Sequence, residues 1–395
     1  MNFDLSWILL GLPLAFVLGW LASRMDVRQM RLENRQAPKA YFKGLNFLLN
    51  EQQDQAIDAF IEAMQNDPDT AELHFALGNL FRRRGEYHRA VRVHEHLLQR
   101  ADLSQADRER AQHGLAQDFL KAGLLDRAED ALRRLEGTPY APDARLALLG
   151  IYERARDWVQ AAAIVRSMQE HGQGDFSTRL SHYLCEQAQA LAQREQLTEA
   201  RALLEQALAT APDAPRPYLD MARVLHRLQD TDAAWQQLEC LAQRAPQALP
   251  LALPLLLELA QGSGREGQAV ALLRQRYAQA PALDVLLALV QLGADPDGQG
   301  AARCTAADAS ACGQQWLLRH LEREPSLIVA RQWVALQPAE GVQPPAPVVQ
   351  ALEHAVRPLM RYRCAACGFE ARQHFWHCPG CQSWDSYPAR RVEEL

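Results

Sequence analysis

The sequence lacks the residue patterns by which most enzymes are recognised. It has no Ser/His/Asp constellation for nucleophilic catalysis and no glycine-rich loop that could cradle a phosphate. Its scattered histidines, among them His74, His88, His94 and His96, fit solvated helix faces. Runs of β-branched residues are also few, so extended sheet is not expected. These absences predict a helical protein that is not an enzyme.

An excess of positive charge is missing as well. The chain carries 42 basic against 48 acidic residues, a net charge of −6. Residues 361–395 hold five arginines against four acidic residues. A nucleic-acid-binding protein needs a basic surface that displaces counterions from phosphates. A zinc ribbon that binds nucleic acid is therefore disfavoured, and salt-dependent binding would test it.

Four of the eight cysteines stand in two Cys-x-x-Cys pairs separated by ten residues: Cys364, Cys367, Cys378 and Cys381. Two such pairs supply four thiolates for one tetrahedral ion, iron or zinc. The closed shell leaves no position for substrate, so the site is predicted to be structural. His374 and His377 are interpreted as packing or surface residues. Because about 35 residues bury too little surface to fold alone, the ion would supply stability.

An uncharged run of 18 residues, Leu5 to Ala22, is close to the length of a membrane-spanning helix. No Lys or Arg precedes it, whereas arginines recur on one helical face of residues 23–36. The positive-inside rule then predicts an anchor at 1–22, a basic juxtamembrane helix at 23–36, and a cytoplasmic body. A cleaved signal peptide is the alternative, but a basic start and a good cleavage site are absent.

A reducing cytoplasm also bears on the cysteines, because thiols stay free there. The two Cys-x-x-Cys pairs are therefore interpreted as a metal site rather than two disulfides. The other four cysteines are expected to be free and without function, and they are Cys185, Cys240, Cys304 and Cys312.

Residues 37–336 show a period of 34 residues. Gly44, Phe47 and Ala56 recur as Gly78, Phe81 and Ala90, and Ala200 recurs as Ala234. This period is typical of tetratricopeptide repeats, in which small residues let two helices cross closely. We expect about seven repeats to residue 281 and a degenerate closing pair at 316–336. Stacked repeats form an α-solenoid with a concave surface that binds segments of other proteins.

Polar residues of the second and third repeats fall where such repeats expose their groove. The candidate partner-binding residues are Asn79, Arg82, Arg83, Gln117 and Lys121. They would suit an acidic or C-terminal peptide, although a solvated helix face is the equal alternative. Residues 337–360 are interpreted as a proline-rich linker and a short helix, and 361–395 as the metal-binding module.

Several segments together resemble one family. Residues 362–369, 375–381 and Trp384 are similar to the rubredoxin-type C-terminus of the lipopolysaccharide assembly protein B (LapB/YciM) family. Residues 44–56, 77–82 and 122–130 resemble its repeats. Gln382 stands where the cysteine turns of rubredoxins usually have glycine. True rubredoxins also separate their two Cys-x-x-Cys pairs by many more residues. Electron transfer is therefore in doubt, and iron versus zinc stays open.

The resemblance implies an all-α repeat protein of the bacterial inner membrane, with a short periplasmic N-terminus. It implies an adaptor that promotes degradation of the deacetylase LpxC by the membrane protease FtsH and so restrains lipopolysaccharide output. A membrane scaffold that gathers lipopolysaccharide synthesis or transport proteins is the alternative, and a rubredoxin-like electron carrier a weaker one. The oligomeric state, a homodimer included, stays open.

Overall fold

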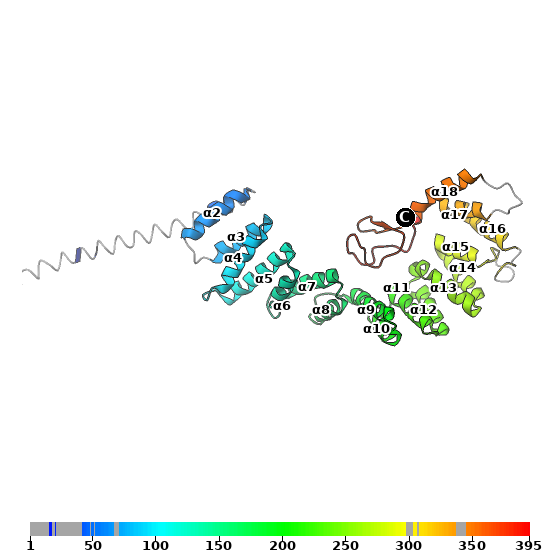
Figure 1. Cartoon of the computed structure of the whole chain (residues 1–395), viewed down its shortest axis with the longest axis horizontal. Coiled ribbons are helices and arrows are strands. Elements are labelled where there is room, and N and C mark those ends of the chain that lie inside the picture. The colour runs from blue at the N-terminus through cyan, green and yellow to red at the C-terminus, as the bar shows by residue number, and fades with distance from the viewer. Residues whose placement is uncertain are drawn as a thin grey trace, which may run out of the picture. The chain divides into compact units, whose positions relative to one another are not determined.

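The computed structural model describes residues 16–17, 20, 42–47, 49–50, 52–66, 71–297, 303–305, 308–336 and 345–395. The chain divides into two compact units, which we call unit 1 (Met1–Gln173) and unit 2 (Gly174–Leu395) (Figure 1). Each is built of antiparallel helix pairs, as the 34-residue period predicts.

Unit 1 contains a short helical stretch at 42–47 followed by seven helices. They are α2 (Gln53–Asn66), α3 (Ala71–Arg83), α4 (Tyr87–Gln99), α5 (Gln105–Ala122), α6 (Leu125–Arg133), α7 (Ala141–Ala155) and α8 (Trp158–Glu170). Local signals fix the boundaries. Ser104 caps α5 by accepting from the Asp107 amide, and Gly123 ends that helix in the left-handed conformation, with φ of 74°.

The recurring glycines of unit 1 lie where two helices touch. A Cβ at Gly44 would stand 2.9 Å from the Phe60 ring, and one at Gly78 only 2.6 Å from His94. Gly114 on α5 meets the other side of His94, at 2.7 Å. Real Cβ atoms do not approach so closely, so these positions require glycine. The repeat pattern in the sequence therefore reflects close packing between helices.

Unit 2 continues with helix pairs and ends in the metal-binding module. Its helices are α9 (Ser177–Gln193), α10 (Leu197–Thr210), α11 (Pro215–Arg227), α12 (Thr231–Arg244), α13 (Leu249–Ser263), α14 (Glu266–Gln279), α15 (Leu283–Gln291), α16 (Ala309–Leu321), α17 (Leu327–Ala335) and α18 (Ala346–Leu359), with 3-10 turns η1 (Pro246–Ala248) and η2 (Val392–Glu394). Strands β1 (Tyr362–Arg363) and β2 (Glu370–Ala371) pair antiparallel.

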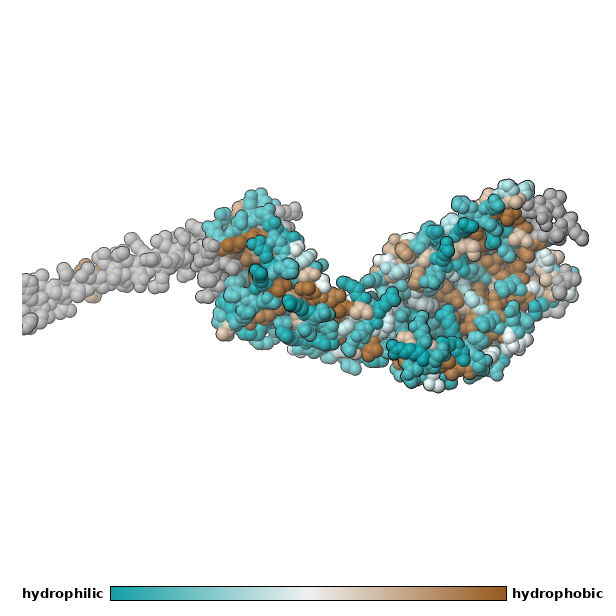
Figure 2. Space-filling model, viewed as in Figure 1, coloured by the Kyte–Doolittle hydropathy of each residue, from teal (hydrophilic) through white to brown (hydrophobic). Residues whose placement is uncertain are grey.

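Hydrophilic residues cover much of the visible face of each unit, with apolar patches among them (Figure 2). Alanines such as Ala56, Ala90, Ala200 and Ala234 are fully buried. Large side chains such as Tyr183 and Leu204 fill the remaining space. The solenoid core is therefore made of small residues at crossings and larger ones between them.

The region after residue 281 departs from the repeat register, as expected. The closing pair is α16 and α17, and it begins at Ala309 rather than near Trp316. The predicted linker lies largely outside the described residues, and α18 follows it. Val356 on α18 is buried, and this helix packs against α17.

The predicted membrane anchor at 1–22 and basic helix at 23–36 lie outside the described residues, apart from residues 16, 17 and 20. These three are helical and exposed. No helix in the described part of the chain has the length and apolar character needed to cross a membrane.

The expectation that all four single cysteines are free was wrong for one pair. Cys185 and Cys240 are free, and Cys185 is fully buried. Cys304 and Cys312, however, form a disulfide with their Cα atoms 6.8 Å apart. The amide of Cys304 bonds the Gly293 carbonyl, which holds Cys304 beside the first turn of α16, where Cys312 lies. The two cysteines are eight residues apart in the sequence, and this spacing alone does not indicate that they meet in the folded chain.

Candidate metal centre

Two turns of the same geometry hold the four cysteines. In the first, the Gly368 amide donates to the Cys364 carbonyl (2.9 Å). In the second, the Gln382 amide donates to the Cys378 carbonyl (2.8 Å). Both Gly368 and Gln382 are left-handed, with φ of 76° and 59°. Gln382 thus adopts the conformation that glycine favours, and the departure noted in the sequence leaves the turn intact.

The four sulfurs converge on one point. Their Sγ atoms all lie within 4.8 Å of one another. The Cys364 and Cys381 sulfurs are 3.8 Å apart, and those of Cys367 and Cys378 are 3.7 Å apart. A tetrahedral ion with bonds of about 2.3 Å to sulfur places its ligands about 3.8 Å apart. Cys364, Cys367, Cys378 and Cys381 therefore form a zinc-ribbon-type metal-binding site, as predicted.

Two of the cysteine thiols donate hydrogen bonds to serine hydroxyls. Ser386 Oγ lies 3.3 Å from the Cys364 sulfur, and Ser383 Oγ lies 3.3 Å from the Cys381 sulfur. Burial acts to raise the pKa of Cys364, but hydrogen bonds with Ser386 and with backbone amides outweigh it and lower the value to about 6. Amide donors of this kind stabilise a thiolate, the form that binds an ion.

The neighbouring sulfurs disfavour ionisation of the Cys367 thiol. The Phe369 amide acts to lower the pKa of the Cys367 thiol, but burial and the neighbouring sulfurs raise it to about 12. A fully deprotonated quartet therefore needs a cation at its centre, and metal binding would release the remaining protons. Since four thiolates close the shell, the ion would hold the two turns together and leave no position for substrate.

Aromatic and histidine side chains join this module to α9. His182 donates from Nε2 to the Asp385 carboxylate at 2.8 Å and stacks on Trp384 with ring centroids 4.7 Å apart. Tyr183 meets the edge of the same indole. His374 bonds the Tyr387 carbonyl, and His377 stacks on Trp384, so both have the packing roles expected of them.

The last residues of the chain fasten the module to two further helices. Glu393 accepts from Ser326 Oγ and from the Leu327 amide, both at 2.6 Å, at the start of α17. Glu394 accepts from the Leu283 amide (2.9 Å) at the start of α15. These carboxylates satisfy free amides and meet the positive ends of the helix dipoles.

Arg391 completes this attachment. Its Nε bonds Asp284 (2.9 Å), its Nη1 bonds the Met360 carbonyl (2.8 Å), and its guanidinium lies over the Tyr362 ring. Figure 1 shows the module folded back toward the helices of unit 2. The sequence gave no sign that residues 391–394 would attach the module to these helices.

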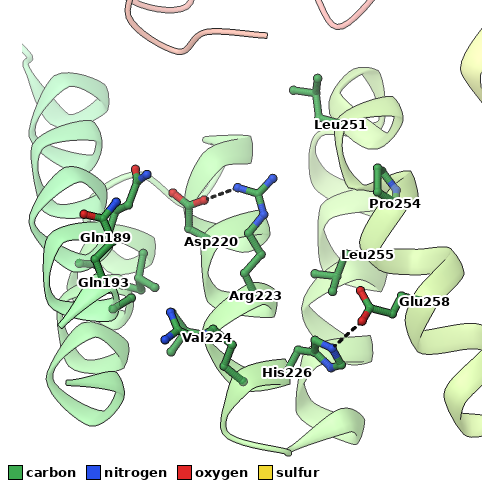
Figure 3. A pocket seen from close by; sticks show the side chains of 14 residues that line it. Gln189, Gln193, Asp220, Arg223, Val224, His226, Leu251, Pro254, Leu255 and Glu258 are labelled. Atoms are coloured by element: carbon green, nitrogen blue, oxygen red, sulfur yellow. Dashed lines mark hydrogen bonds and ion pairs between the residues drawn. The ribbon is translucent and has the colours of Figure 1, made fainter. Parts of the chain in front are cut away.

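A pocket lies between α9, α11 and α13, with a volume of about 530 Å³. Gln189 and Gln193 stand on one wall and Leu251, Pro254 and Leu255 on another (Figure 3). Leu251 also packs against the core of the metal-binding module. Sequence reasoning missed this pocket because its residues come from three repeats and form no contiguous motif.

The predicted partner-binding residues of unit 1 separate into two kinds. Arg83 and Lys121 are exposed, as a groove role requires. Arg82, however, is partly buried and bonds both Asp118 (2.8 Å) and the Gly114 carbonyl (3.1 Å), and it also bonds Asn79. Arg82 therefore joins α3 to α5. Gln117 is half-buried, 3.5 Å from His113.

The interpretation of His74 and His94 as solvated was wrong, because both side chains are buried. His88 and His96 are exposed. His94 is 1% exposed, and its Nδ1 lies 2.6 Å from Asp118, which is itself fully buried. Asp118 thereby bonds His94 and Arg82 at once. The signal available in the sequence was the pair of glycines, Gly78 and Gly114, that make room for the imidazole.

Comparisons with known proteins agree with this architecture. Residues 362–387 match the family model of a rubredoxin metal binding domain. Residues 43–102, 113–175 and 191–259 match tetratricopeptide repeat models.

Two curated relatives match along nearly their whole length. Lipopolysaccharide assembly protein B of Escherichia coli K12 is 30% identical over 99% of this chain and 100% of its own. The protein of the same name from Haemophilus influenzae is 26% identical over 96% of each chain. Among solved structures, a tetratricopeptide repeat protein from Parabacteroides merdae covers 65% of this chain and 98% of its own, at 15% identity and a TM-score of 0.33.

Proposed function

Because this chain belongs to the lipopolysaccharide assembly protein B family, we propose that it regulates lipopolysaccharide biosynthesis by holding other proteins rather than by catalysis. The observation that carries the proposal is the match to the Escherichia coli relative over 99% of the chain, repeats and metal-binding module included. Stacked helix pairs offer extended binding surfaces. The four-cysteine site has a closed shell, which suits a structural ion.

At a finer level, we propose an adaptor that presents the deacetylase LpxC to the membrane protease FtsH. The uncharged run at residues 5–22 would anchor the chain in the inner membrane with its body in the cytoplasm. An adaptor and a protease in one membrane meet at a higher effective concentration than in free solution. The exposed Arg83 and Lys121 of unit 1 are candidate contacts for either partner.

The half-life of LpxC in cells tests this proposal. We expect LpxC to persist when the chain is absent and to turn over normally when the full chain is restored. A chain that starts at Ala37, expressed at the same level, should restore turnover poorly because it lacks the anchor. A chimera with an unrelated transmembrane helix shows whether tethering alone suffices.

Unchanged LpxC turnover in cells without the chain would refute the adaptor proposal. Crosslinking in membranes, followed by identification of the captured proteins, then tests the scaffold alternative. Capture of several lipopolysaccharide synthesis enzymes without FtsH would favour the scaffold.

A further inference from the structure

The pocket of unit 2 combines an apolar floor with a polar rim. The floor is built from Ala188 and Ala192 on α9, Val224 on α11, and Leu251 and Leu255 on α13. Its volume of about 530 Å³ falls in the range of about 300–1,000 Å³ usual for ligand sites. The pocket is therefore large enough to enclose apolar side chains of a ligand.

The ionisable groups around the pocket already have hydrogen-bond partners. The pairs are Arg223 with Asp220 (3.0 Å), His226 with Glu258 (3.3 Å) and Arg227 with Glu195 (2.7 Å). Two of these pairs are visible in Figure 3. Asp220 also accepts from the buried Arg216 (3.2 Å), which fixes it further. A charged ligand would have to break a pair, so the pocket favours an uncharged one.

Two glutamines stand one turn apart at the rim. Gln189 and Gln193 are both exposed on α9, and no hydrogen-bond partner for either side chain lies in the described part of the chain. Each amide has both a donor and an acceptor, as a peptide group does. Side chains of this kind can hold the backbone of an extended segment whatever its sequence.

We propose that this pocket binds a short, uncharged and apolar segment of a partner protein in extended conformation. Gln189 and Gln193 bond its backbone, and one or two of its side chains occupy the floor between Val224, Leu251 and Leu255. A lipid acyl chain is the competing occupant, but it offers nothing for the two amides to bond. The inference rests on the proposed function in that the segment belongs to a protein that the chain holds.

The test uses the purified full chain and an array of capped, fluorescent heptapeptides. One set carries Leu, Ile, Val or Phe at the central positions, and a matched set carries Asp there. We expect binding, measured by anisotropy, for members of the apolar set and at least tenfold weaker binding for their acidic counterparts. Binding of the acidic set as tight as the apolar set, or no binding by either, would overturn the proposal.

Variants locate the binding. Gln189→Ala with Gln193→Ala should weaken it about tenfold, because two hydrogen bonds are lost. Pro254→Glu, which adds an unpaired charge to the exposed part of the pocket, should weaken it similarly. Gln206→Ala on α10, an exposed glutamine outside the pocket, is the matched control. Full affinity in the double variant, or equal loss in the control, would place binding elsewhere.

Binding of a fluorescent fatty acid tests the competing occupant, a lipid acyl chain. If a fluorescent fatty acid binds more tightly than every peptide and competes with them, the pocket is a lipid site and the proposal fails. None of these results depends on LpxC turnover. A failure of the pocket inference is therefore distinguishable from a failure of the adaptor proposal.

Discussion

The two units use the polar residues of their helix pairs differently. In unit 1, Asp118 on α5 bonds both Arg82 on α3 and His94 on α4. In unit 2, side chains such as His182 and Asp284 instead bond the chain's own metal-binding module. In the same repeat pattern, polar side chains thus bond helices to one another in unit 1 and hold the metal-binding module in unit 2. Polar residues at equivalent places cannot be assigned to ligand binding from the pattern alone.

The largest expected effect is loss of the metal ion, which should affect unit 2 and leave unit 1 unchanged. Cys378→Ser should release the ion and unfold the module, because metal binding supplies roughly 10–16 kcal/mol in such sites. All four ligands belong to unit 2, so the unfolding of unit 1 should not change. Metal content by mass spectrometry and helicity by circular dichroism check both parts, and the absorption spectrum of the native protein distinguishes iron from zinc.

Free Cys240 provides the control, since Cys240→Ser removes a thiol that is no ligand. Stoichiometric metal in the Cys378→Ser variant would contradict the four-cysteine assignment. A large loss of helicity would instead show that unit 2 depends on the module for its own folding.

The second effect belongs to unit 1. Asp118→Ala leaves His94 and Arg82 without their shared partner, and removing one member of a buried pair costs about 3–5 kcal/mol. We expect thermal or urea unfolding of unit 1 to shift to a clearly lower midpoint. Asp126→Ala, on the exposed face of α6, should change little. Equal stability of the two variants would refute a structural role for the buried carboxylate.

A smaller effect tests the attachment at the end of the chain. Glu393→Gln weakens the charge-assisted bonds to Ser326 and the Leu327 amide, at an expected cost of about 1–2 kcal/mol. Hydrogen exchange should accelerate at the start of α17 while the metal stays bound. Glu353→Gln on the exposed face of α18 is the matched control. Unchanged exchange would mean that Glu393 contributes nothing to docking.

The smallest effect is a pH dependence in unit 2. Burial lowers the pKa of His320, whose Nδ1 lies 2.7 Å from the Tyr277 hydroxyl. The unfolded chain then binds more protons than the folded one, so this contribution is present above the unfolded pKa of about 6.5 and is lost as pH falls. His320→Gln should flatten the stability curve of unit 2 below that pH. A profile identical to that of the native chain would exclude His320 as its source.

The sequence predicted well whatever depends on local spacing. The four metal ligands follow from two Cys-x-x-Cys pairs, and the helix pairs follow from a 34-residue period. It failed where residues far apart meet. The buried role of His94 depends on Asp118 in the next repeat, the disulfide of Cys304 on its bond to Gly293, and the pocket on three repeats at once. Such contacts are set by tertiary packing, which no single stretch of sequence encodes.

Leu251 belongs both to the pocket wall and to the core that surrounds Cys364 and Cys378. A side chain shared by two sites makes their equilibria dependent on each other. By thermodynamic reciprocity, any change that metal loading makes in ligand affinity must reappear as an equal change in metal affinity when ligand is bound. A chain engaged with a ligand would then bind its ion with a different affinity from an empty one, so the affinity for the ion would report the occupancy of the pocket.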